Sequence, residues 1–171
     1  MDNYIISKIY PDDRRSNRLI DELLDAEGIR RDRNLDYTCG IFDEEYRLLA
    51  TGSCYGNTLR CLAVSGMHQG EGLMNQIVTH LMEVQFGRGN SHIFLYTKPS
   101  TARFFSDLGF YEIVHIADKV VFMENKKQGF KDYLKELSQN KKEGKRIASI
   151  VLNANPFTLG HLYLVEKAAA E

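Results

Sequence analysis

The chain has 171 residues, of which 43% are hydrophobic and 26% are charged, so it buries a real core and suits one ordinary domain with a short remainder. Lys and Arg number 22 against 23 Asp and Glu. The chain is therefore not a polycation of the kind that binds nucleic acid or the surface of an anionic membrane. The polar first residues and the lack of an apolar run of ~20 residues give no sign of a signal peptide or membrane span. Cys39, Cys54 and Cys61 lack the spacing of a metal site or a disulfide framework, and we expect reduced thiols in a cytoplasmic protein.

The first third of the chain predicts a strand, a helix and a group of three strands. Residues 4–10 alternate as a strand does, and a helix follows that Asp12 or Asp13 caps and Gly28 ends. Residues 39–42 and 46–54 are apolar runs separated by three acidic residues, as in a hairpin. A turn at Gly56-Asn57 leads into a further strand over residues 59–64. Three antiparallel strands in succession are the simplest arrangement of these runs.

The period of the apolar residues then changes. Residues 71–86 carry apolar side chains three and four apart, which predicts an amphipathic helix. A short strand over residues 93–96, a helix over residues 101–108 and two strands over residues 110–114 and 120–123 follow. The order β-α-β-β-β-α-β-α-β-β indicates one α/β domain over residues 1–125.

The charge of the chain is unevenly distributed. Residues 125–146 hold eight Lys or Arg and three acidic residues, a net of +5, and the rest of the chain holds 14 basic and 20 acidic residues, a net of −6. We expect residues 126–146 to form a basic helix and a linker. Their charge fits either a solvated helix face or a surface for an acidic partner or a phosphorylated ligand.

The last 25 residues differ in kind from the rest. Residues 147–152 are a continuous apolar run typical of a strand buried on both faces of a parallel sheet, and a helical tail follows from residue 158. We therefore interpret residues 147–171 as the first β-α unit of a second domain.

A glycine-containing turn precedes the long helix. It reads Gln69-Gly70-Glu71-Gly72-Leu73-Met74, and the free N–H groups of a helix N-terminus behind glycines can hold a diphosphate. Glycine needed only for tight turning is the alternative. For His68 the alternatives are a base or phosphate contact and an ordinary surface histidine, and Glu71 fits a first-turn carboxylate that interacts favourably with the helix dipole.

This domain resembles the GNAT family of acyl-CoA N-acyltransferases, a mixed and mostly antiparallel α/β fold. In that family a Q/R-x-x-G-x-G/A turn binds the pyrophosphate of acetyl-CoA, and Gln69 and Gly72 match it while Met74 replaces the small last residue. The resemblance implies a site for CoA, acetyl-CoA or a dephospho-CoA-like group made of Leu62, Val64, Gln69, Gly70, Glu71, Gly72, Leu73 and Met74. Many members use a Tyr to protonate the departing thiolate, but Phe105 stands at that position and has no proton to give.

A second motif, Thr158-Leu159-Gly160-His161, stands at the start of the helical tail. A hydroxyl, backbone N–H groups and an imidazole at a helix N-terminus can hold triphosphate oxygens, while a capping Thr with a structural His is the alternative. The motif resembles the (H/T)-x-G-H signature of the Rossmann-like nucleotidyltransferase superfamily. That resemblance implies catalytic roles for Thr158 and His161, and an ATP site made of Asn155, Phe157, Thr158, Gly160 and His161.

The two motifs in this order, together with Tyr96-Thr97-Lys98-Pro99, resemble the citrate lyase ligase family. The resemblance implies that acetate and ATP with Mg²⁺ form acetyl-adenylate, whose acetyl group passes to the thiol prosthetic group of the acyl-carrier subunit of citrate lyase. The GNAT-like domain would bind the CoA-like group. Because the nucleotide site is incomplete, we do not expect these residues to form acetyl-adenylate alone. Alternatives are a stand-alone acetyl-CoA-dependent N-acetyltransferase and a non-catalytic module that binds CoA or the carrier.

Overall fold

A computed structural model of the chain describes residues 4–141, 143–144, 147 and 149–170. The chain divides into two compact units, Met1–Tyr133 and Leu134–Glu171. Each unit is described on its own.

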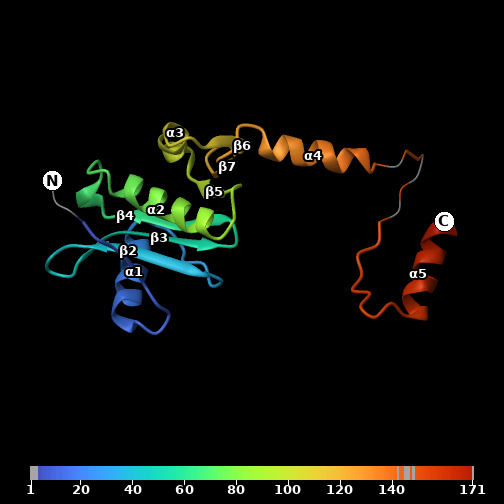
Figure 1. Ribbon diagram of the computed structural model, residues 1–171, viewed down its shortest axis with the longest axis horizontal. Helices are drawn as coiled ribbons and strands as arrows, with labels where there is room; N and C mark the ends of the chain where they lie inside the picture. The colour runs from blue at the N-terminus through green and yellow to red at the C-terminus, as the bar shows by residue number, and fades with distance from the viewer. Residues whose placement is uncertain (1–3, 142, 145–146, 148, 171) are drawn as a thin grey trace. The chain divides into compact units, whose positions relative to one another are not determined.

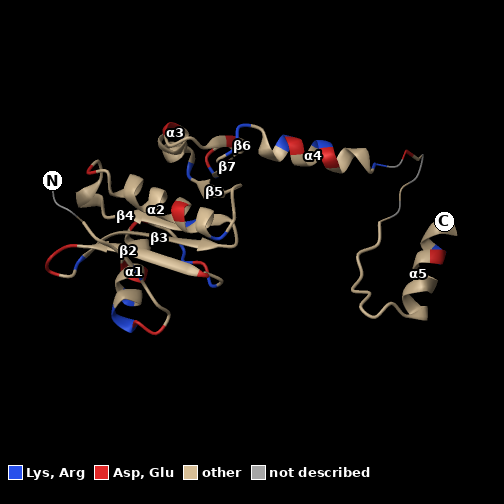
Figure 2. Cartoon of the chain, viewed as in Figure 1, with Lys and Arg blue, Asp and Glu red and all other residues tan. Residues whose placement is uncertain are grey.

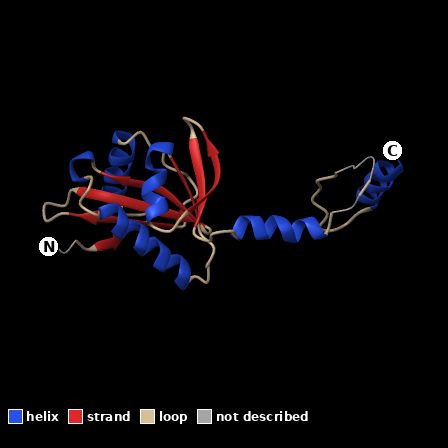
Figure 3. Cartoon of the chain, turned by 90° about the horizontal axis from the view of Figure 1, so that it is seen from above, coloured by secondary structure: helices blue, strands red, loops and turns tan. Residues whose placement is uncertain are grey.

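The first unit is built on a single seven-stranded sheet in the order β1-β2-β3-β4-β5-β7-β6. Figure 3 shows the strands of this sheet in red, with helices packed beside them in blue. The strands are β1 (Ile6–Lys8), β2 (Tyr37–Phe42), β3 (Leu48–Tyr55), β4 (Thr58–Val64), β5 (Phe94–Thr97), β6 (Tyr111–Ile116) and β7 (Val120–Glu124). Only β4 and β5 pair in parallel, and every other neighbouring pair is antiparallel. This confirms the predicted mixed, mostly antiparallel sheet.

Helices cover both faces of this sheet. Figure 1 shows α1 (Arg14–Ala26) on one face and α2 (Leu73–Gly87) on the other, with α3 (Pro99–Asp107) beside the last strands. The carboxylate of Asp13 accepts the Ser16 N–H at 3.0 Å and so caps α1, as predicted. β3 is buried along almost its whole length because it lies between α1 and α2.

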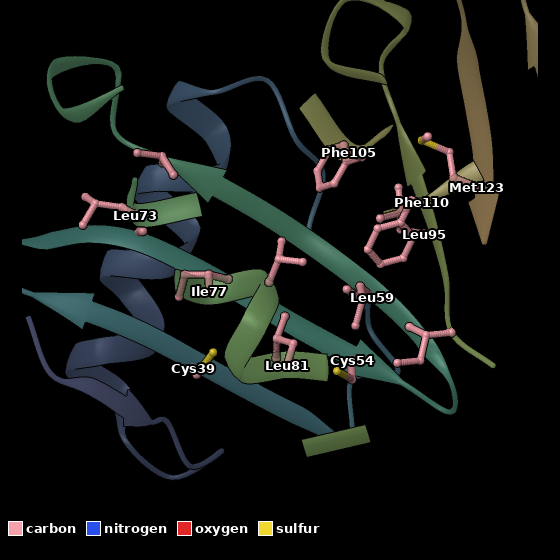
Figure 4. Packing of buried hydrophobic residues seen from close by; sticks show 14 of the residues in the cluster. Cys39, Cys54, Leu59, Leu73, Ile77, Leu81, Leu95, Phe105, Phe110 and Met123 are labelled. Carbon is pink, nitrogen blue, oxygen red and sulfur yellow. The ribbon is translucent and has the colours of Figure 1, made fainter. Parts of the chain in front are cut away.

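The larger part of the core lies under α2. Figure 4 shows Leu73, Ile77 and Leu81 of α2 over the strands, with Phe105, Phe110 and Met123 in the same cluster toward the far end of the sheet. Leu73, Ile77 and Leu81 recur every four residues along α2, which is the spacing that predicted the helix. The three cysteines are free thiols, as expected.

Two local features differ from the predictions. β1 is shorter than residues 4–10, because its pairing with β2 covers only Ile6–Lys8 before the chain turns toward α1. A short 3₁₀ helix, η1 (Gly66–His68), intervenes between β4 and α2 and was not predicted. It moves the glycine turn away from the end of the strand.

The region after the sheet contains α4 (Gly129–Gln139), which begins in the first unit and ends in the second. This confirms a helix within residues 126–140. Its own charges balance, Lys131 and Lys135 against Asp132 and Glu136, as Figure 2 shows. The predicted positive charge therefore lies in the flanks of α4, and three of the linker residues, at positions 142, 145 and 146, are outside the described residues.

The second unit contains α5 (Leu159–Ala170), which confirms the helical tail. The strand expected over residues 147–152 is wrong for residues 147 and 149–152, which have no strand structure, and residue 148 lies outside the described part of the chain. The physical reason is that a strand needs a neighbour for its backbone hydrogen bonds, and the described residues offer this segment none. A Rossmann-like start is therefore not observed. No helix within the described ranges is long and apolar enough to cross a membrane.

Candidate functional site

The two parallel strands at the centre of the sheet separate along their length. β4 and β5 pair only at Thr58 with Phe94 and at Leu59 with Leu95. Beyond Leu59, β4 continues to Val64 without a partner strand on that side within the described residues. The separation opens a pocket of about 710 Å³, a volume within the range of small-molecule and cofactor sites.

A bulge in β4 shapes the wall of this pocket. Two residues, Cys61 and Leu62, oppose Gly52 alone in β3, and Cys61 has a φ of +51°. A Cβ on Gly52 would approach Ile77 of α2 to 2.5 Å and the side chains of Leu62 and Leu81 to 2.9 Å, so glycine is needed where α2 and the bulge both pack against β3. A positive φ at a residue other than glycine costs on the order of 1–3 kcal/mol and often marks a functional segment. Nothing in the sequence around Cys61 predicts it.

Most of the residues predicted for a CoA-like group meet in the pocket. Among the described residues, Glu71 is the one member of the predicted set that does not line it. The members that do are Leu62, Val64, Gln69, Gly70, Gly72, Leu73 and Met74. They come from β4, the turn after η1 and the first turn of α2, so one end of the pocket is formed by the segment that the sequence singled out.

The glycine turn leaves the N-terminus of α2 open. Gly70 and Gly72 have φ values of +92° and +78°, and a Cβ on either would meet nothing within 4 Å. Gly72 caps α2 without a side-chain hydrogen bond. The first N–H groups of a helix have no partner within the helix and carry its positive partial charge, so this turn is suited to an anion such as a diphosphate.

His68 and Glu71 flank the turn and contact each other. The Nδ1 atom of His68 lies 3.2 Å from Oε2 of Glu71. His68 lines the pocket and Glu71 lies outside it. The pair therefore positions the His68 ring at the rim of the pocket.

Phe105 forms part of the apolar wall. Its side chain is buried and packs edge-on against Phe104 and Phe110, with ring centroids 5.2 and 6.4 Å away. Tyr96 contributes to the lining and Tyr111 does not. The position at which the resemblance leads us to expect a tyrosine is thus filled by a packed hydrocarbon ring, and the phenol in the lining comes from β5.

No sequence motif assigns the remaining lining residues to a site. These residues come from the segment after α1, from β4, from the first turn of α2, from β5, from the start and middle of α3, and from the turn before β7 with its first residue. They are Glu27, Gly28, Ile29, Cys61, Ala63, Asn75, Tyr96, Thr97, Lys98, Thr101, Phe104, Lys119 and Val120. Cys61, Ala63 and Asn75 are sequence neighbours of the predicted residues, and the others lie far in sequence from the glycine turn, so no local pattern links those others to it. Burial raises the pKa of the Cys61 thiol above its ordinary value, which keeps this lining residue neutral at physiological pH.

The second motif forms the start of α5. The backbone N–H of Thr158 donates to Nδ1 of His161 at 3.0 Å, and the Thr158 hydroxyl lies 2.9 Å from the same nitrogen. Because Nδ1 accepts from a backbone N–H, a neutral His161 carries its proton on Nε2. Phe157 stacks near the ring at 5.7 Å. The structure thus brings Thr158 and His161 together and leaves an Nε2–H donor at a helix N-terminus.

Three curated relatives share the sequence pattern over most of the chain. The [citrate [pro-3S]-lyase] ligase of Klebsiella pneumoniae is 41% identical over 131 residues, 77% of this chain and 38% of the relative. The ligases of Escherichia coli K12 and Haemophilus influenzae are 36% and 33% identical over 82% and 88% of this chain, and 41% and 45% of their own lengths. The chain spans less than half the length of these relatives. A family model described as the citrate lyase ligase C-terminal domain matches residues 147–171.

Solved structures share the fold of the first unit. An acetyltransferase of the GNAT family from Staphylococcus aureus Mu50 matches with a TM-score of 0.58 at 14% identity, over 72% of this chain and 99% of that one. An aminoglycoside 6'-N-acetyltransferase complexed with coenzyme A matches with a TM-score of 0.59 at 14% identity, over 70% and 95%. The fold is therefore the GNAT acetyltransferase fold.

Proposed function

We propose that this chain, a homologue of the citrate lyase ligases with a GNAT acetyltransferase fold, is part of an ATP-dependent ligase that acetylates the thiol prosthetic group of the citrate lyase acyl-carrier subunit. In this reaction acetate attacks the α-phosphate of ATP and pyrophosphate leaves, which gives acetyl-adenylate. The thiol then attacks the acetyl carbonyl, loses its proton, and AMP leaves as the thioester forms. The observation that carries the proposal is the 33–41% identity to three ligases over most of the chain.

The pocket of the first unit supports a role in holding the CoA-like arm of the prosthetic group. The arm would run along the unpaired edge of β4 at Leu62 and Val64, and its diphosphate would lie at Gly70–Gly72. The open space above both glycines fits a close approach of phosphate to the backbone. In this proposal the nucleotide motif takes part in the activation of acetate by ATP, and the GNAT fold binds the prosthetic group.

The start of α5 supports a role in nucleotide binding. The Nε2–H of His161 would donate to a phosphate oxygen, and the Nδ1 contact with Thr158 holds the ring in the required tautomer. The described residues contain no cluster of three or more His, Cys, Asp or Glu that could hold a metal ion. We therefore propose that Mg²⁺ binds with the phosphates of ATP, and we assign it no ligand in this chain.

Two other functions compete with this one. A stand-alone N-acetyltransferase is favoured by the fold, but it must work without a proton donor at Phe105, which is buried in an aromatic cluster. A non-catalytic module that binds CoA or the carrier is favoured by the same observation. Turnover of acetyl-CoA with a panel of amines would support the first of these and contradict the purely binding role that we assign to the pocket.

The direct test is a calorimetric titration of the chain with dephospho-CoA. We expect saturable binding that Gly72→Ala weakens at least about fivefold, because the new Cβ enters the open turn at a positive φ. Gly87→Ala is the matched control, since Gly87 is also open but lies at the end of α2 away from the pocket. Absence of binding at millimolar dephospho-CoA would overturn the pocket assignment.

The partner is tested with the acyl-carrier subunit itself. Amide NMR signals of residues 62–74 should shift when the carrier in its thiol-bearing form is added. The carrier that lacks the prosthetic group should need a concentration at least about tenfold higher for the same shift. Equal effects of the two forms would show that the prosthetic group does not enter the pocket.

A further inference from the structure

The two edges of the seven-stranded sheet differ in length and in chemistry. β1 forms one edge and pairs over only three residues, the last of which is Lys8. Short strands and edge lysines are features that keep a sheet from pairing with another chain. β6 forms the other edge with six residues, and these include no lysine, proline or glycine. Because β6 is rich in β-branched and aromatic residues, its outer edge is suited to accept a further strand.

One face of β6 is apolar and exposed. Tyr111, Val114 and Ile116 are 41%, 48% and 46% exposed. They lie on the same face of the sheet, because their partners in β7 are every second residue of that strand. The rings of Phe122 and Tyr96, stacked at 4.5 Å, continue this face into β7 and β5. An exposed apolar face beside an unpaired strand edge is typical of an interaction surface.

The opposite face of β6 carries one carboxylate and one imidazole. Glu112 and His115 pair with Met123 and Val121 of β7, which point into the core on the side that α3 covers. A bulge between Glu112 and Val114 brings Glu112 and His115 to the same face although they are three residues apart. Oε2 of Glu112 lies 3.3 Å from Nδ1 of His115, and their side chains are 43% and 46% exposed. Both groups are therefore accessible at the edge.

The order of residues along β6 is complementary to itself in one antiparallel register. If Glu112 of one copy lies opposite His115 of a second copy, a two-fold axis also sets His115 of the first opposite Glu112 of the second. In this register Tyr111 lies opposite Ile116, so that the apolar side chains meet on the other face. Opposite charges directly across a strand pair are favourable and like charges are unfavourable. No two like charges within β6 oppose each other in this arrangement.

We infer that β6 is an interface between two copies of this chain, whose β6 strands pair antiparallel and join the two sheets across a two-fold axis. The complementary order of Glu112 and His115 favours a second copy, because an unrelated strand would match this order only by chance. The interface is small, so we expect a Kd on the order of 100 µM and a monomer at low micromolar concentration. In the sheet, β5 and β7 separate β6 from β4 and the glycine turn that follows it, so the inference does not depend on the proposed function.

The test exchanges the charges across the interface. Sedimentation velocity of the chain from about 5 to about 500 µM, a range that brackets this Kd, should show a monomer that becomes a dimer. Glu112→Lys sets an ammonium group opposite His115, and His115→Glu sets two carboxylates opposite each other. Each variant alone should therefore weaken dimerisation about fivefold, because the two-fold axis repeats the altered pair. An equal mixture of the two variants restores opposite charges and should dimerise as well as the unaltered chain. Ile5→Lys, which adds a charge at a 76% exposed residue beside β1, should have no effect.

The mixture separates pairing of β6 from association through any other surface, because only charges that face each other are restored by mixing. The double variant Glu112→Lys/His115→Glu carries both exchanges in one chain and should also dimerise, which keeps the test decisive if circular dichroism shows that a single variant does not fold. Recovery of the dimer in the mixture or in the double variant supports the inference. A chain that stays monomeric over the whole concentration range, or a dimer that neither single variant weakens, would overturn it. So would a mixture and a double variant that both associate no better than the single variants.

Discussion

The buried carboxylate of Glu124 is expected to be one of the most sensitive polar positions of the first unit. Only 3% of the residue is exposed. Its Oε2 accepts from Nε2 of His92 at 2.6 Å and from the backbone N–H of Phe130 at 2.8 Å. A Cβ on Gly129 would meet Oε2 at 2.9 Å, so glycine permits this approach of α4 to β7. The carboxylate thus ties the first turn of α4 to the sheet.

Glu124→Ala removes both hydrogen bonds and leaves their donors without an acceptor. A hydrogen bond to a charged group contributes about 1.5–3 kcal/mol, and breaking a buried pair costs about 3–5 kcal/mol. The His92 side chain is 26% exposed and regains some hydration, so we expect a loss of about 3 kcal/mol in the free energy of unfolding. With a urea m-value of about 2 kcal/mol/M, the midpoint falls by about 1.5 M. Glu124→Gln keeps an acceptor for Phe130 and should lose about half as much.

The matched control is Glu112→Ala. Glu112 also pairs with a histidine, His115, but at 3.3 Å and with side chains 43% and 46% exposed. An exposed pair of this kind contributes less than about 1 kcal/mol. Urea unfolding followed by circular dichroism compares the three variants. If Glu124→Ala is no more destabilising than Glu112→Ala, the reasoning from burial is refuted.

Three further predictions concern packing, acid stability and thiol reactivity. Gly52→Ala should destabilise the chain by about 1–3 kcal/mol through overpacking, because its Cβ would lie 2.5 Å from Ile77 Cγ2. Gly87→Ala, whose Cβ would lie in open space, is the control and should not destabilise the chain by this mechanism. Equal urea midpoints of the two variants would contradict the prediction. Hydrogen bonds, first from the backbone of Arg47, lower the pKa of Asp43 below its ordinary 3.8. Its stabilising contribution is therefore present above pH 3.8 and lost as the pH falls through the lowered value, so Asp43→Asn should flatten the acid dependence of the thermal midpoint. Burial raises the pKa of Cys39 to about 12, so iodoacetamide at pH 8 should modify Cys61 before Cys39, and peptide mass spectrometry that finds the reverse order would refute this.

Much of the fold follows from local patterns. The four-residue spacing of Leu73, Ile77 and Leu81 predicts α2, and the Asp13 cap and Gly28 bound α1. The failure lies in residues 147–152, whose apolar run predicts a strand that the described residues do not form. Hydrophobicity indicates that a segment is to be buried, but a strand forms only beside another strand.

The candidate site divides in the same way. The glycine turn is readable from sequence because a turn before a helix is local chemistry. Cys61 at a positive φ, and Lys98 and Lys119 in one lining, are not readable, because they depend on how β3, β4 and β5 pair.

The sequence by itself determined the GNAT-like order of elements, the glycine turn before α2 and the Thr158–His161 motif. The turn and the motif each rest on residues within about one helical turn of one another, and each element rests on the local period of its apolar residues, which covalent geometry sets. Only the tertiary structure decided where the pocket lies and how its charge is arranged. The separation of β4 from β5 after two paired residues creates a cavity whose walls come from residues as far apart in sequence as Glu27 and Val120, and no local pattern encodes such an approach.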